Sequence, residues 1–164
     1  MKKTILSTLC FLLVSCFMFF ADAGTRIVVL GSSTAAGAGV SDSNRAWVNQ
    51  YRTYLQSIDP TNTVTNLAKG GYTTCAIMPT GTDPYNTGNH ILEVDTERNI
   101  TKALSLSPNA IIINMPTNDV SNGIPVATQM KHFATIIDLA KAAGVKVWIT
   151  TSQPHNFGEK DDCP

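Results

Sequence analysis

The chain has 164 residues, a formal net charge of zero and a charged fraction of only 15%. This length fits one domain, and the balanced charge excludes the basic surface that nucleic-acid-binding proteins use. No metal-ligand spacing occurs among its histidine and cysteine residues, and the sequence predicts neither a metal nor another cofactor.

The first 23 residues have the features of a signal peptide. Two lysines precede an apolar stretch at residues 5–20, and residues 21–23 (Ala-Asp-Ala) have the small-x-small pattern of a signal-peptidase site. We therefore expect a mature domain of residues 24–164, secreted or periplasmic, with no membrane span after cleavage. The alternative is a lipid anchor at Cys16, because the residues that lead up to it are similar to a lipobox.

Strand-like and helix-like segments alternate along the mature chain. The apolar run at residues 26–30 predicts a buried strand, and β-branched residues predict a second strand at residues 63–67. Between them, a helix is expected to begin at Ser43 or Asn44 and to end at Asp59. One face of this helix is apolar and consists of Trp47, Tyr51, Tyr54, Leu55 and Ile58.

The second half of the chain continues the alternation. Gly, Pro, Thr and Asn are frequent at residues 78–89, which predicts a surface excursion, and a helix is expected to open at Asp95 or Thr96. Residues 110–114 predict the most buried strand, followed by a helix between Pro125 and Gly144 and a fourth strand at 145–151. This βαβ order predicts a flavodoxin-like three-layer α/β/α sandwich with a parallel sheet.

Three of the predicted strands end in loops of glycine and small polar residues. These loops contain Ser33, Gly71 and Asn118. Because the carboxyl ends of parallel strands lie at one edge of the sheet, where ligands of open α/β folds bind, we expect the loops to converge. Ser33 is then a candidate nucleophile, with the Ser33 N–H, the Gly71 N–H and the Asn118 amide as oxyanion donors. Alternatively, the first loop is a flexible turn or an anion cradle, and Asn118 is an ordinary turn residue.

The same loops resemble the conserved blocks of the GDSL/SGNH hydrolases, from about residue 26 to residue 154. Ser33 falls at the nucleophile position, Gly71 at the oxyanion glycine and Asn118 at the oxyanion asparagine. The resemblance implies a serine hydrolase that cleaves acyl or acetyl esters of small molecules or carbohydrates. Together with the signal-peptide pattern, it leads us to expect an exported enzyme, and we expect it to be a monomer. The alternative from another class is a flavodoxin-like module that binds FMN or another anion.

Several positions depart from the family pattern. Ser32 and Thr34 replace the aspartate and leucine beside the nucleophile, and Pro116 replaces a glycine. More important, the family takes its catalytic histidine and aspartate from an Asp-x-x-His block after a fifth strand, and the sequence reaches Pro164 without that block. The resemblance therefore implies a domain with four of the usual five strands, inactive as given.

The histidines and cysteines of the mature chain provide few other candidates. We expect His90 and His132 to be solvated surface residues, whereas His155 follows the fourth predicted strand and is the remaining candidate base. Cys75 and Cys163 either form a disulfide after export or stay unpaired. The fourth strand, at one edge of the sheet, is expected to be apolar and unpaired on one side, which favours aggregation.

Overall fold

The computed structural model describes residues 24–115 and 117–151. Its centre is a sheet of four strands in the order β2-β1-β5-β6. The strands span Thr63–Asn66 (β2), Arg26–Gly31 (β1), Ala110–Asn114 (β5) and Lys146–Ile149 (β6). All three pairings are parallel, which confirms the predicted α/β fold with a parallel sheet.

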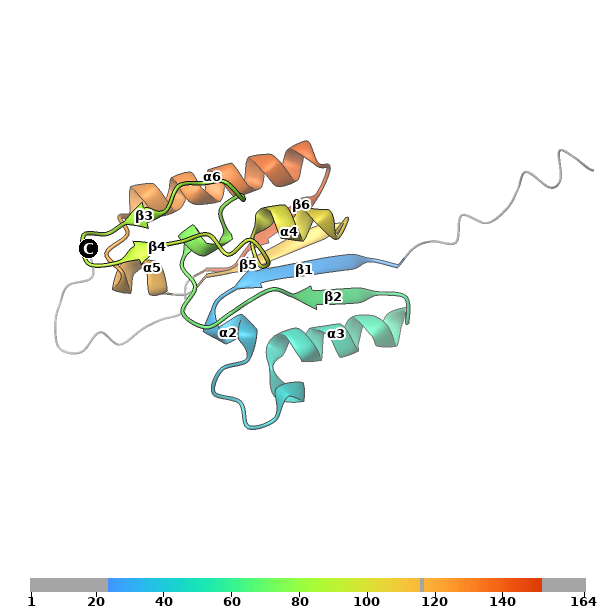
Figure 1. Cartoon of the computed structure of the whole chain (residues 1–164). Helices are drawn as coiled ribbons and strands as arrows, with labels where there is room; N and C mark the ends of the chain where they lie inside the picture. The colour runs from blue at the N-terminus through green and yellow to red at the C-terminus, as the bar shows by residue number, and fades with distance from the viewer. Residues whose placement is uncertain (1–23, 116, 152–164) are drawn as a thin grey trace, which may run out of the picture.

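Helices cover both faces of this sheet (Figure 1). The helices are α2 (Ser33–Ala36) and α3 (Trp47–Ile58) on one face, and α4 (Ile100–Ser105) and α6 (Val126–Ala142) on the other. Side chains along β1 alternate between these faces, as they do in any strand. Ile27 and Val29 pack in one cluster with Val48 of α3. Val28 and Leu30 belong to a second cluster with residues of α4 and α6, so the core lies in two layers.

Two helix starts differ from the predicted ones. Residues Ser43–Arg45 form a separate 3-10 helix, η1, which Asp42 caps, and α3 begins only at Trp47. Helix α4 begins at Ile100, where the Asn99 side chain accepts a hydrogen bond from the Lys102 N–H. The prediction of a start at Asp95 or Thr96 was wrong because the Asp95 carboxylate accepts bonds from Tyr72 and from the Glu97 N–H in a preceding turn.

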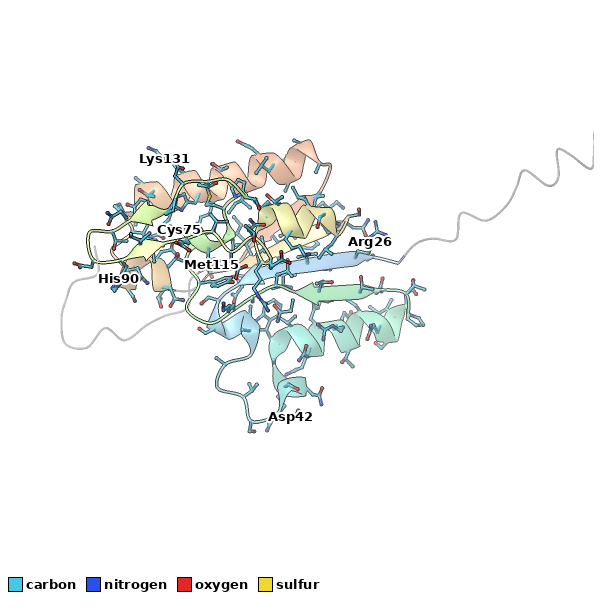
Figure 2. All side chains as sticks on the ribbon, in the orientation of Figure 1. Arg26, Asp42, Cys75, His90, Met115 and Lys131 are labelled. Atoms are coloured by element: carbon cyan, nitrogen blue, oxygen red, sulfur yellow. The ribbon has the colours of Figure 1, made fainter. Side chains whose placement is uncertain are left out.

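The surface excursion predicted at residues 78–89 contains the first strand of a small hairpin, and the second strand lies just after it. Strands β3 (Tyr85–Asn86) and β4 (Ile91–Leu92) pair antiparallel, and η2 (Thr74–Ile77) precedes them. The hairpin lies at the end of the molecule where β1 ends, and His90 is at its outer end (Figure 2). Strands of two residues are too short to show an alternating pattern, so neither strand could be predicted here.

The fourth strand forms one edge of the sheet. Within the described part of the chain, β6 pairs only with β5. The Trp148 side chain is 50% exposed, and Trp148, Trp47 and Tyr51 line a hollow of about 520 Å³ on the α3 face of the sheet. The apolar edge strand predicted at residues 145–151 is therefore present, with the shorter bounds of β6.

Candidate active site

The loops that follow β1, β2 and β5 meet at the carboxyl edge of the sheet. Ser33 is the first residue of α2, and a Cβ placed on Gly70 would lie 4.0 Å from the Cβ of Ser33. Asn118 opens the short helix α5 (Asn118–Ser121), and its amide donates to Ser32 Oγ at 2.6 Å and to the Tyr72 carbonyl at 2.9 Å. One asparagine thus joins the Ser33 loop to the Gly71 loop.

Backbone N–H groups of two loops are available at this junction. Ser33 begins a helix, so its N–H has no carbonyl one turn earlier to bond. Neither the Ser33 N–H nor the Gly71 N–H donates a hydrogen bond within residues 24–115 and 117–151. Gly71 has a φ of +83°, a left-handed conformation that costs other residues about 1–2 kcal/mol. The fold therefore requires glycine where an oxyanion donor was predicted.

Ser32 has a role that the sequence did not reveal. Its side chain is fully buried, its N–H donates to the Asn114 carbonyl at 3.1 Å, and its hydroxyl oxygen accepts from Asn118. The replacement of the family's aspartate by Ser32 therefore leaves a neutral hydroxyl in contact with the Asn118 amide. The position beside Ser33 was the available signal, but no sequence pattern pairs Ser32 with a residue 86 positions away.

Asp119, the next residue, binds the Gly71 loop at a second point. Its carboxylate accepts the Thr74 N–H at 3.0 and 3.1 Å and the Thr74 hydroxyl at 2.5 Å. Asp119 is only 2% exposed, and this burial raises the pKa of its carboxyl group although the bonds from Thr74 oppose the shift. Asn118 and Asp119 together hold the loop on both sides of Thr73.

His132 is not the solvated residue that the sequence predicted. It is half-buried on α6, and its Nδ1 lies 2.7 Å from Thr74 Oγ1. The edge of its ring also meets Tyr85, with centroids 6.2 Å apart and planes at 88°. The prediction was wrong because these partners belong to η2 and β3, which the helical pattern around residue 132 does not reveal. Burial lowers the pKa of His132.

The outer side of the same loop carries a polar cluster. The Tyr72 hydroxyl donates to Asp95, and Lys69 lies 3.9 Å from that carboxylate. The hydrogen bond from Tyr72 lowers the pKa of Asp95, and burial with the neighbouring carboxylate raises the pKa of Tyr72. Gly71, Tyr72 and Asp95 line a hollow of about 430 Å³ that extends to Ile91 and Leu92 of the hairpin.

Neither described histidine bonds Ser33. His90 is exposed in the hairpin turn, and His132 is engaged by Thr74. His155 lies outside the described residues, as do Cys163 and the predicted signal peptide, so the disulfide and the export signal stay predictions. Cys75 is buried in η2, and burial raises the pKa of its thiol.

Asp119→Ala is expected to lower the free energy of unfolding by about 2–4 kcal/mol, because two buried Thr74 donors lose their acceptor. Asp119→Asn keeps an acceptor and should lose less. Since the carboxyl pKa is higher in the folded state than its usual 3.8, the folded protein binds more protons between the two values. Wild-type stability should therefore fall as the pH rises through that interval.

Urea unfolding at a series of pH values measures this effect. The fall in stability above pH 4 should be smaller in Asp119→Asn than in the wild type. A profile identical in both proteins would contradict the assignment of the raised pKa to Asp119.

No helix in the described part of the chain is long and apolar enough to cross a bilayer. Among the same residues, no group of three or more His, Cys, Asp or Glu side chains is placed to hold a metal ion.

Solved structures share this fold at low sequence identity. The crystal structure of TesA aligns with 82% of this chain and 65% of its own length, at a TM-score of 0.60 and 21% identity. A psychrotrophic esterase, EstA from Pseudoalteromonas sp., aligns with 82% of this chain and 64% of its own length, at a TM-score of 0.56 and 17% identity. A two-domain esterase active on acetylated mannans, CEX, aligns with 77% of this chain and 30% of its own length, at a TM-score of 0.54 and 18% identity. The chain thus spans less than two thirds of these relatives.

No curated protein matches the chain in sequence. The sequence profile of the GDSL-like lipase/acylhydrolase family, in contrast, matches residues 29–163. That span includes all three converging loops and nearly the whole predicted mature domain. The chain therefore belongs to the GDSL-like lipase/acylhydrolase family.

Proposed function

We propose that this protein hydrolyses carboxylic esters through Ser33. The Ser33 oxygen attacks the carbonyl carbon and loses its proton to a base, and the carbonyl oxygen becomes an oxyanion. The bond to the alcohol then breaks, and the alcohol leaves with a proton. Water hydrolyses the acyl-serine to release the carboxylic acid and restore Ser33.

The observation that carries this proposal is the place of Ser33 among hydrogen-bond donors. Its own N–H and the Gly71 N–H are not used within the described residues, and a Cβ placed on Gly70 would lie 4.0 Å from the Ser33 Cβ. The Asn118 amide is the third candidate donor. It now bonds Ser32 and Tyr72, so it would serve an oxyanion by turning one N–H away from those acceptors.

The hollow beside Gly71 supports a small or hydroxyl-rich substrate. At about 430 Å³ it has room for a short acyl group or one sugar unit, and Tyr72, Asp95 and Thr96 give it polar walls. Esters of small molecules or carbohydrates, acetyl esters included, are the substrate class that we propose. We also propose that residues 1–23 direct export to the periplasm or the medium, and that the mature protein acts as a monomer.

We place the general base outside the described residues, because His90 is exposed in the hairpin and Thr74 holds His132. Loss of the histidine of a catalytic triad lowers turnover by a factor on the order of 10⁶. Because neither described histidine bonds Ser33, we test Ser33 by a reaction that needs only one event per molecule.

The experiment is covalent labelling with an ethylphosphonate ester that has a p-nitrophenol leaving group. Ser33 displaces p-nitrophenolate and forms one P–O bond, so the intact mass should rise by one ethylphosphonyl group, and peptide mapping should find it on Ser33. Ser33→Ala should stay unlabelled, whereas Ser41→Ala, a change at an exposed loop serine, should react like the wild type. Labelling elsewhere, or equal labelling of Ser33→Ala, would reject the proposal.

A further inference from the structure

A chain of hydrogen bonds links three elements behind the Gly71 loop. Asp119 at α5 accepts the Thr74 hydroxyl at 2.5 Å, and Thr74 Oγ1 lies 2.7 Å from His132 Nδ1 on α6. Thr74 begins η2 and ends the loop of residues 70–74. These hydrogen bonds thus connect the loop that contains Gly71 to α6, a helix on one face of the sheet.

This cluster contains a carboxylate, a hydroxyl and an imidazole, but it is not arranged for nucleophilic catalysis. Thr74 is 0% exposed, so no substrate carbonyl reaches its oxygen. Its hydroxyl also stands between the other two groups, whereas a nucleophile needs the imidazole between itself and the carboxylate. The arrangement suits a group that holds a loop in place.

The number of protons determines which group donates in each of these hydrogen bonds. Thr74 has one hydroxyl proton, and it donates this proton to Asp119, 2.5 Å away, when that carboxyl group is ionised. The Thr74 oxygen must then accept a proton from its other neighbour, His132 Nδ1. Burial lowers the pKa of His132, which is therefore neutral at pH 7 and must carry its one proton on Nδ1.

Groups of three elements surround the ring of His132. Asp119 of α5 is the group whose charge acts on it, Cys75 of η2 lies near Asp119, and Tyr85 of β3 packs against the ring. Lys131 points outward from α6 (Figure 2). The lysines of the neighbouring elements, Lys102 in α4 and Lys146 in β6, are not among the groups that shift the pKa of His132.

We propose that His132 is a positioning residue for the oxyanion donor of Gly71. By donating Nδ1–H to Thr74, it directs the Thr74 hydroxyl onto Asp119 and so fixes the end of the loop of residues 70–74. Asn118 fixes the same loop at the Tyr72 carbonyl, one residue after Gly71. The role of Gly71 as an oxyanion donor rests on the proposed ester hydrolysis. The role of His132 in fixing the loop of residues 70–74 does not.

The first test is the tautomer of His132, read from the ¹⁵N shifts of its ring nitrogens in the full chain. Neutral His132 should carry its proton on Nδ1, and the Thr74→Val variant should lose that preference. An Nε2–H tautomer in the wild type would overturn the proposal, since Nδ1 would then accept the Thr74 proton that Asp119 needs.

The second test is amide hydrogen exchange at Tyr72 and Thr74, whose N–H groups bond Lys69 and Asp119. Thr74→Val should speed exchange about 5- to 30-fold, the effect of one or two lost hydrogen bonds, and Thr74→Ser should restore protection. Thr135→Val is the matched control, because that hydroxyl bonds the Lys131 carbonyl on the exposed side of α6. Equal exchange in all variants would overturn the proposal.

The third test separates positioning from packing. His132→Asn retains an N–H donor near the place of Nδ1 and should keep both the protected loop and the rate of Ser33 phosphonylation, whereas His132→Leu should lose both. His90→Asn serves as the control at an exposed histidine. Equal effects of Asn and Leu at residue 132 would overturn the proposal. If the loop loosened in His132→Leu but Ser33 reacted in neither the wild type nor any variant, the proposed ester hydrolysis would be rejected and the role of His132 in holding the loop would stand.

Discussion

Asn118→Ala is expected to slow phosphonylation of Ser33 by about 10²–10³-fold, the usual effect of removing one oxyanion donor. The Asn118 amide also joins Ser32 to Tyr72, so its loss should leave the Ser33 and Gly71 loops less firmly aligned. The rate of p-nitrophenolate release under single-turnover conditions measures the effect. This readout needs one reaction at Ser33 and does not depend on turnover.

Two further variants separate the two roles of Asn118. Asn118→Asp retains the size of the side chain but presents negative charge, and should react at least as slowly as Asn118→Ala. Ser32→Ala removes only the hydroxyl that accepts from Asn118, leaves the amide donor in place, and should slow the reaction far less. If Asn118→Ala reacted at the wild-type rate, Asn118 would have no part in the site.

Ile113→Ala is expected to lower the free energy of unfolding by about 2–5 kcal/mol, the cost of emptying a fully buried aliphatic site. Ile113 is 0% exposed in β5, which pairs with both β1 and β6, and it belongs to the cluster beneath α4 and α6. No side chain can move far enough into the centre of a sheet to fill the space. Urea unfolding followed by circular dichroism measures the difference.

The matched control is Ile91→Ala in β4, which removes the same atoms from a side chain that is 67% exposed. This change should alter the unfolding free energy by less than about 0.5 kcal/mol. Equal losses in the two variants would contradict the division between a buried sheet and an exposed hairpin.

The sheet was predictable from the sequence because its two central strands, β1 and β5, are nearly continuous apolar runs. Residues 26–30 and 110–114 have to be buried on both faces, and only a parallel sheet under two helical layers does so. Strands that run parallel bring their polar loops to one edge of the sheet, and for this reason the loops of Ser33 and Asn118 were expected to meet. In the structure the Asn118 amide bonds Ser32 and the Tyr72 carbonyl. The catalytic roles of Ser33, Gly71 and Asn118 stay predictions.

What the sequence missed are contacts between residues far apart in the chain. His132 was assigned to solvent because its helix has an exposed face, but its partner Thr74 is 58 positions away and arrives with η2. Ser32 was noted only as a departure from the family pattern, although its buried hydroxyl accepts a hydrogen bond from Asn118. In both cases the residue is buried by another element of the fold, and the local sequence pattern does not indicate that burial.

The placement of the two tryptophans gives the protein a built-in optical probe. The chain contains two tryptophans, and Trp47 and Trp148 line the same hollow over β5 and β6. Fluorescence excited selectively at tryptophan therefore reports on that one region, which also includes Thr34 beside Ser33. Anything that covers the hollow would remove water from the indole of Trp148 and shift its emission to shorter wavelength.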